Sequence, residues 1–347
     1  MSTSLPFLPL APQCGRCKKK ENLMRCARCK VMLYCSQEHQ KYDYSDHKHA
    51  CSAVDKKQRL LDHEEEKLRA EPGDGLFMPA NPFENSVGLF WGVWGTRDYM
   101  RARFGLVDAL GDVNTYDAVR KQLVHARDML RLCRSDNLGI RDLVPSLLLR
   151  LNRDQECYDF IKWWCTTGQD SHYDWANMDL GYLDIQNANA FEPIAGLVHG
   201  FKDLGMMNAL ALLKIKLLLD LVALKNSTDV PTLRVIPRGV FDAIRSHLPR
   251  SPIITQDNAM LERDDHSTEI RNLEEQVCQL YSHIHKQNPY CWRLLLYPGA
   301  FLEKDERPGM YSRGSFEEAQ IVLGYSHDAW IETPGARAVI KAQYEGR

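Results

Sequence analysis

Six cysteines and two histidines between positions 14 and 51 form four regularly spaced pairs. Two pairs have a C-x2-C spacing, and in the other two pairs the residues lie four apart. Thiolate and imidazole are the side-chain donors that zinc prefers, and four of them make the closed tetrahedral shell of a structural site. Eight donors are therefore enough for two structural zinc ions. The predicted ligands are Cys14, Cys17, Cys26, Cys29, Cys35, His39, His47 and Cys51.

The spacing of the pairs indicates how they would reach a metal. A C-x2-C pair closes a tight turn, so that both sulfurs point to one ion. Residues four apart share one face of a helix, so each of the other pairs can offer two donors from one helical turn. A sequential grouping, in which consecutive pairs share an ion, fits the spacing as well. We expect the interleaved grouping, with Cys14, Cys17, Cys35 and His39 on one ion and Cys26, Cys29, His47 and Cys51 on the other.

This stretch resembles a MYND-type zinc finger. Two positions depart from that family's pattern, because His39 stands where a cysteine is usual and Tyr44 where a tryptophan is usual. Histidine also binds zinc, so the first change should keep the metal. The rest of the chain resembles the helical region of uncharacterised fungal proteins that carry this finger. The resemblance to the finger rests on Tyr34-Cys35-Ser36, Gln40, Asp43, His47-Lys48 and Cys51.

The resemblance implies a function in protein recognition. MYND-type fingers bind short proline-containing peptides along a small strand and an adjacent helix, a form of strand addition with side-chain pockets. By resemblance, the groove would include Ser36, Gln40 and Tyr44, where tyrosine keeps a smaller aromatic wall than tryptophan. We therefore expect a zinc-binding protein–protein interaction adaptor, regulatory in role, whose finger recognises a short peptide of a partner.

The alternative function is nucleic-acid binding by a transcriptional regulator. A basic loop could contact phosphates, yet no recognition helix follows it and the acidic remainder of the chain would repel a duplex. We therefore expect protein partners and no nucleic acid. The basic residues concerned are Lys18, Lys19, Lys20, Arg25, Arg28 and Lys30.

Enzymatic activity is not expected. In SET-type methyltransferases with such a finger, part of the catalytic domain precedes it, whereas thirteen residues precede Cys14 here. The sequence also lacks N-H-S-C, G-E-E-L, G-x-S-x-G, G-x-G-x-x-G and P-loop motifs.

Charge and cysteine usage bear on partners and compartment. Residues 1–60 contain twelve Lys/Arg and five Asp/Glu, a net charge of +7, and the remaining residues contain 32 and 41, a net charge of −9. The five cysteines outside the finger show no paired spacing, and no signal peptide is visible, which favours a reducing compartment. We expect an intracellular protein of the nucleus or cytoplasm.

The sequence pattern after the finger predicts mostly helices. We expect a flexible tail (1–10), the finger (11–54), a charged exposed helix with a Gly/Pro-rich linker (55–86) and an α-helical domain (87–347). The fold class is a small two-zinc MYND-like finger followed by an all-α, helical-repeat-like domain, either a degenerate tetratricopeptide (TPR) arrangement or an α-solenoid. Expected helices include residues 98–111, 116–133, 139–151, 154–166 and 268–286.

Two details of that region can be predicted individually. Pro145 lies inside the pattern of 139–151 and should end or kink that helix. The apolar run 204–225 contains Lys214, Lys216 and Asp220, so it should form a buried helix and not a membrane span.

Overall fold

The computed structural model describes residues 10–199, 203–229, 238–302 and 307–346. Contacts divide these residues into two compact units. The finger unit holds the described residues up to Leu147 together with Asp174–Tyr182, and the C-terminal unit holds Leu148–Tyr173 and the described residues from Leu183 onward. The predicted boundaries at residues 54 and 86 rest on composition and remain predictions. Residues 1–9 of the predicted tail lie outside the described residues.

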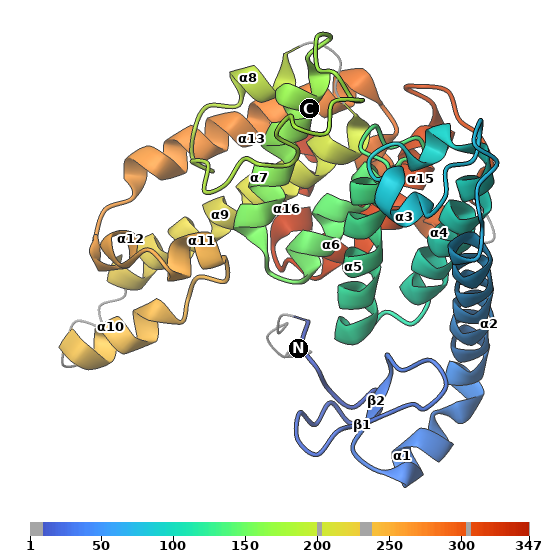
Figure 1. Cartoon of the computed structure of the whole chain (residues 1–347). Coiled ribbons are helices and arrows are strands. Elements are labelled where there is room, and N and C mark those ends of the chain that lie inside the picture. The colour runs from blue at the N-terminus through green and yellow to red at the C-terminus, as the bar shows by residue number, and fades with distance from the viewer. Residues whose placement is uncertain (1–9, 200–202, 230–237, 303–306, 347) are drawn as a thin grey trace. The chain divides into compact units, whose positions relative to one another are not determined.

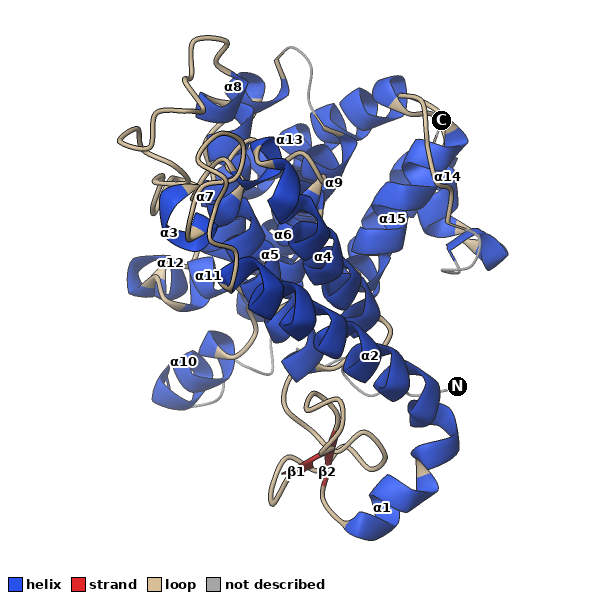
Figure 2. Ribbon diagram, turned by 45° about the vertical axis from the view of Figure 1, so that its right-hand side comes forward, coloured by secondary structure: helices blue, strands red, loops and turns tan. Residues whose placement is uncertain are grey.

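The finger unit begins with a two-stranded antiparallel sheet, red in Figure 2, which pairs Met24 with Tyr34 and Arg25 with Leu33. Helices follow it along the chain. The elements of the unit are β1 (Met24–Arg25), β2 (Leu33–Tyr34), α1 (Gln37–Tyr42), α2 (Tyr44–Arg69), α3 (Pro82–Asn85), the 3-10 turns η1 (Phe90–Gly92) and η2 (Trp94–Thr96), α4 (Arg97–Gly111), α5 (Tyr116–Leu132) and η3 (Ile140–Asp142).

Helix α2 joins the finger to the helices that follow. It runs without interruption from Tyr44 to Arg69, and Figure 1 shows it rising in dark blue from beside the sheet. Val54, Leu61 and Leu68, seven residues apart, are buried where α2 packs along α4. The prediction of an exposed charged helix starting at residue 55 is therefore wrong in two respects: the helix starts earlier, and one narrow face is buried.

Helices α4 and α5 pack against each other behind α2. Thr115 caps α5, because its hydroxyl accepts a hydrogen bond from the Ala118 amide at 3.2 Å, as expected for a threonine at this position. The predicted helix over residues 116–133 is confirmed as α5, and Val119, Leu123 and Met129 are among its buried residues.

Pro145 corrects one prediction. Residues 139–151 are not one helix that Pro145 ends or kinks, because a 3-10 turn (η3) comes first and α6 (Val144–Arg150) then begins directly before Pro145. The N–H groups in the first turn of a helix have no intrahelical acceptor. Proline, which lacks this N–H, therefore fits there without loss of a backbone hydrogen bond.

The C-terminal unit is helical, with α9 at its centre. Nearly all side chains of α9 from Leu204 to Leu221 are buried, and α13, α15 and α16 pack against it. Its elements are α7 (Asp154–Cys165), η4 (Thr167–Gln169), α8 (Ala195–Val198), α9 (Leu204–Asp229), α10 (Arg238–Ser246), α11 (Pro252–Thr255), α12 (Asn258–Glu262), α13 (Ser267–Gln287), α14 (Cys291–Leu296), η6 (Gly299–Leu302), α15 (Phe316–Ile331) and α16 (Ala336–Glu345).

Charged residues inside α9 are paired within the protein. Lys214 donates to the backbone carbonyls of Ala190 and Glu192, and Lys216 forms an ion pair with Asp154 at 2.8 Å. Among the described residues, no helix is both long enough and apolar enough to cross a bilayer. The helical-repeat-like arrangement, a degenerate TPR or an α-solenoid, remains a prediction.

Candidate metal centre

The two C-x2-C pairs form the same backbone turn. The amide of Lys18 donates to the carbonyl of Cys14 at 3.0 Å, and the amide of Lys30 donates to the carbonyl of Cys26 at 2.9 Å. Lys18 and Lys30 both have φ near +60°, a left-handed conformation that costs a residue with a side chain about 1–2 kcal/mol. The same unfavourable conformation occurs at equivalent positions in both turns. We infer that closure of the turn around the paired sulfurs imposes it.

Of the other two pairs, His47 and Cys51 share a helix as their spacing predicts, whereas Cys35 precedes the helix that holds His39. His39 is in α1, which starts just after Cys35 and is capped by Ser36, whose hydroxyl accepts the His39 amide at 3.2 Å. His47 and Cys51 lie one turn apart near the start of α2. The same helix therefore supplies two metal donors and, further along, the contacts with α4.

The eight donors meet in two groups of four. In each group all donor atoms lie within 4.8 Å of one another. The structure thus shows the interleaved grouping, not the sequential one. The outer cluster is Cys14, Cys17, Cys35 and His39, and the inner cluster is Cys26, Cys29, His47 and Cys51.

The separations of the donors fit tetrahedral zinc. Zn–S bonds of about 2.3 Å and Zn–N bonds of about 2.0 Å place neighbouring donors roughly 3.5–3.8 Å apart. In the outer cluster, the Sγ atoms of Cys17 and Cys35 lie 3.5 Å apart, and the Sγ of Cys14 lies 3.6 Å from Nδ1 of His39. Both clusters are therefore positioned to bind zinc.

The inner cluster shows the same fit. The Sγ atoms of Cys26 and Cys51 lie 3.7 Å apart, and the Sγ of Cys29 lies 3.4 Å from Nε2 of His47. The two histidines thus present different ring nitrogens, Nδ1 in the outer cluster and Nε2 in the inner one.

Electrostatics favour the protonation state that a metal needs at Cys14 and His47 and oppose it at other donors. A hydrogen bond with Cys17 raises the pKa of Cys35 to about 11, and burial raises that of Cys51 to about 12. Burial opposes ionisation of Cys14, but backbone amides of Cys17, Cys35 and Arg16 directed at its sulfur lower its pKa to about 6. Burial lowers the pKa of His47, which keeps that imidazole neutral and able to donate to a metal. Thiolate and neutral imidazole are the zinc-binding forms of these side chains.

The two clusters differ in burial and in surroundings. All four donors of the inner cluster are buried, whereas in the outer cluster only Cys14 is buried and Cys17 is exposed. Tyr34 is fully buried, like the inner donors, and its hydroxyl donates a hydrogen bond to Asp43 Oδ2 at 2.7 Å. The inner cluster therefore forms part of a packed interior, and the outer cluster lies at the surface.

Three contacts fix the finger to the helices of its unit. The Thr115 hydroxyl donates to the carbonyl of Val31 at 2.7 Å, Arg25 forms an ion pair with Asp117 at 2.9 Å, and Arg28 forms one with Asp55 at 3.1 Å. Sequence reasoning missed these three contacts. Pairs separated by up to 92 positions carry no local pattern.

The predicted peptide-groove residues lie along α1 and the start of α2. Ser36 and Gln40 share a helical face, with the Gln40 amide donating to the Ser36 carbonyl at 3.2 Å, and both are half-buried. Tyr44 is the first residue of α2, and its side chain is 63% exposed. The hydroxyl of Ser36 already serves as a helix cap, so Gln40 and Tyr44 are the more available of the three.

Two interleaved Cys3His clusters, held by a two-stranded sheet and two helices, define a compact zinc finger joined to a helical region. Residues 13–51 match the MYND finger family. The chain thus contains a MYND finger with two clusters that can hold two zinc ions.

Similarity to individual proteins covers a small part of this chain and of each relative. The chain is 50% identical over 38 residues to Egl nine homolog 1 of Homo sapiens, which is 11% of this chain and 9% of that protein. It is 36% identical over 75 residues to Rho GTPase-activating protein gacZ of Dictyostelium discoideum, which is 21% of this chain and 7% of that protein. No solved structure matches the chain. Matches that cover so little of each protein carry no information about enzymatic activity.

Proposed function

We propose that this chain is a non-enzymatic, zinc-dependent interaction adaptor, and that its finger binds a short peptide segment of a partner protein. The chemistry of the finger supports the first part of the proposal, because closed four-donor clusters hold shape and leave no coordination position for a substrate. The MYND finger at residues 13–51 supports the second part, since such fingers often mediate protein–protein interaction.

The observation that carries the proposal is the exposure of two aromatic side chains on a metal-held frame. Tyr42 and Tyr44 are 70% and 63% exposed, whereas Tyr34 of the same finger is buried. Exposed tyrosines provide contact area with little entropy loss and are enriched at protein interfaces. Arg16 stacks over the Tyr42 ring at 4.3 Å, which leaves Tyr44 as the more available of the two rings.

The wider proposal concerns the rest of the chain. The helical region would supply a second interaction surface, as a helical-repeat scaffold like that of fungal proteins with the same finger, and the adaptor would act in regulation inside the cell. None of these points follows from the finger alone, and each rests on the resemblance of the sequence and on its composition.

Nucleic-acid binding has weaker support. Two of the basic residues that could contact phosphates, Arg25 and Arg28, form ion pairs with Asp117 and Asp55. A phosphate contact would have to compete with these carboxylates. The exposed Lys18, Lys19, Lys20 and Lys30 would then carry the interaction alone.

A peptide-display selection tests the proposed function. Zinc-loaded full-length protein would be used to select from a random twelve-residue library, and each selected peptide would be measured against wild type, Tyr44→Ala and the control Tyr290→Ala. Tyr290, 43% exposed, lies in the C-terminal unit. We expect peptides whose affinity falls about tenfold or more in Tyr44→Ala alone, as for a central interface aromatic.

A loss of peptide affinity is informative only if the variant still holds its zinc. Each variant is therefore assayed for two zinc ions per chain. The absence of enriched peptides, or enrichment that Tyr44→Ala leaves intact, contradicts the proposed peptide site. Binding that instead falls steeply with salt and is shared by a DNA duplex of any sequence favours the nucleic-acid alternative.

A further inference from the structure

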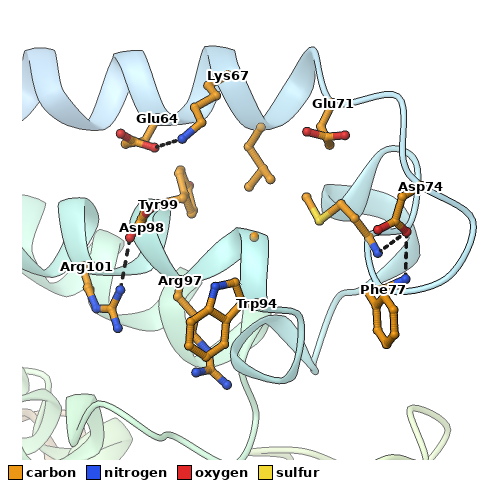
Figure 3. A pocket seen from close by; sticks show the side chains of 13 residues that line it. Glu64, Lys67, Glu71, Asp74, Phe77, Trp94, Arg97, Asp98, Tyr99 and Arg101 are labelled. Carbon is orange, nitrogen blue, oxygen red and sulfur yellow. Dashed lines mark hydrogen bonds and ion pairs between the residues drawn. The ribbon is translucent and has the colours of Figure 1, made fainter.

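The finger unit contains a cavity of about 630 Å³ at the far end of α2 from the zinc clusters. Glu64, the first lining residue on α2, is thirteen residues beyond Cys51, a distance of about 20 Å along the helix axis. Figure 3 shows the last turns of α2 on one side, the start of α4 with Trp94 on the other, and the loop around Asp74 and Phe77 closing the third side. A volume of this size is in the range of ligand-binding clefts.

The cavity combines a buried floor with exposed aromatic walls. Leu68 and Tyr99 are 4% exposed and form part of its floor, whereas Trp94 and Phe77 are 76% and 81% exposed. Adjacent large apolar side chains with such high exposure are common at interaction sites. The walls therefore offer exposed apolar area, although Arg97 lies over part of the Trp94 ring.

The loop that presents Phe77 has a fixed shape. One carboxylate oxygen of Asp74 accepts the amides of Leu76, Phe77 and Met78 at 2.7–2.9 Å. Three backbone bonds to one side chain hold the turn closed, so Phe77 is presented on an ordered support. A preformed wall reduces the entropy that a ligand must overcome on binding.

Charge at this end of α2 is negative. Residues 62–74 contain six Asp/Glu and two Lys/Arg, a net charge of −4. Of the three basic lining residues, Lys67 is paired with Glu64 at 3.6 Å and Arg101 with Asp98 at 3.1 Å, and Arg97 lies over the Trp94 ring. Four acidic residues also line the cavity, so the lining keeps a net charge of −1. Among the described residues, no lysine or arginine lies within ion-pair distance of Glu71 or Asp74. The cavity therefore favours a cation next to its aromatic walls.

A cation of the protein itself already contacts one of these walls. The guanidinium of Arg97 stacks over Trp94 at 4.5 Å from the ring centroid, and its Nε donates to the carbonyl of Trp91 at 3.0 Å. Tryptophan is the aromatic side chain that attracts cations most strongly. The Trp94 side chain is 76% exposed and lines the same cavity as Glu71 and Asp74.

We propose that this cavity binds a lysine- or arginine-containing peptide segment of a partner protein, with apolar side chains on Phe77 and Trp94 and the cation near Glu71. The site lies outside the finger and does not depend on the function proposed for it. It would give the adaptor a second binding surface, of opposite charge to the basic finger, on the same helix.

A matched set of labelled peptides tests the proposal on the zinc-loaded full-length chain. The probe is a six-residue peptide of alternating leucine and lysine, and the two comparison peptides carry glutamate or serine in place of lysine. Fluorescence anisotropy at low salt should give a Kd below about 1 mM for the lysine peptide. The glutamate peptide should bind at least about tenfold more weakly, since the carboxylates would repel it.

Variants then locate the binding. Trp94→Ala should weaken the lysine peptide about tenfold through loss of the ring, and Glu71→Gln should weaken it about threefold through loss of one charge. Tyr44→Ala, in the same unit, is the matched control and should leave this peptide unchanged, so failure here is distinguishable from failure of the finger's peptide site. Both cavity side chains are at the surface, and circular dichroism confirms that the variants fold.

Several outcomes would overturn the proposal. These are no binding up to 1 mM, equal binding of the lysine and glutamate peptides, or binding that Trp94→Ala leaves unchanged. A concentration-dependent dimer that Trp94→Ala abolishes would assign the cavity to a second copy of the chain. Cosedimentation with phosphatidylserine vesicles that depends on Trp94, in the absence of peptide binding, would assign it to a membrane surface.

Discussion

The finger and helix α9 are stabilised in different ways, although both lie inside compact units. In the finger, the buried side chains are largely metal donors, with Cys14, Cys26 and Cys29 among the least exposed. In α9, a run of leucines is buried against neighbouring helices. A stretch of some forty residues cannot bury enough apolar surface to fold alone, and metal coordination replaces the missing core. The comparison predicts that the two regions respond differently to the same perturbations.

Chelation should give the largest difference. Removing zinc at pH 7 withdraws a binding free energy of about 10–16 kcal/mol per site in zinc-finger peptides. We expect amides of residues 14–51 to lose protection in hydrogen exchange followed by mass spectrometry. Amides of α9 should keep their protection, because no metal donor lies in that helix. Equal loss of protection in both regions would show that the helical packing depends on zinc as well.

The two clusters should separate in a second experiment. Cys29→Ser removes a buried donor of the inner cluster, and Cys17→Ser removes an exposed donor of the outer one. Each variant should lose about one zinc per chain by elemental analysis. Only Cys29→Ser should also destabilise α2 and its packing on α4, by at least about 2 kcal/mol more than Cys17→Ser, since it leaves buried donors without a partner. Identical thermal unfolding of the two variants would contradict this difference in role.

The free energy of unfolding of the C-terminal unit, which is stabilised by packing, should depend on pH through the buried Lys214. Burial lowers the pKa of Lys214 to about 7, although Glu192 favours the charged form, against an ordinary value near 10.5. Between pH 7 and 10.5 the unfolded chain therefore binds this proton more tightly, and the free energy of unfolding should rise with pH.

The rise attributable to Lys214 should be about 2 kcal/mol from pH 7 to 8.5. Urea unfolding followed by circular dichroism measures it as the difference between wild type and Lys214→Met, which removes the titrating group. Lys341→Met is the control, because Lys341 is exposed at the surface of α16. A Lys214→Met variant with the same pH slope as wild type would show that another group titrates.

The smallest effect concerns the junction between the finger and its helices. Thr115→Ala removes both the cap of α5 and the hydrogen bond to the Val31 carbonyl. We expect a loss of about 1–2 kcal/mol and faster zinc transfer to a chromophoric chelator. Ser315→Ala removes the comparable cap of α15, and zinc transfer should then proceed at the wild-type rate. Equal rates in the two variants would argue that the finger's metal retention is independent of this junction.

Features that depend on near neighbours could be predicted from the amino-acid sequence. The spacing of eight donors identified the zinc-binding stretch, because each pair is joined by a turn or a helical turn. Apolar periodicity located α5 and α13 closely, and Lys214 and Lys216 within the run 204–225 pointed to a buried helix instead of a membrane span. These signals act over four residues or fewer, which is the range that a pattern in the chain can encode.

Only the tertiary structure decided how those parts combine. It grouped the donors into interleaved clusters where spacing allowed two pairings, extended α2 from the finger into the helices, and placed Pro145 at the start of a helix. It also brought Thr115 to Val31, and Phe77 and Trp94 to one cavity. Each of these outcomes depends on contacts between residues far apart in the chain, whose energies come from packing and desolvation and leave no periodic trace in the sequence.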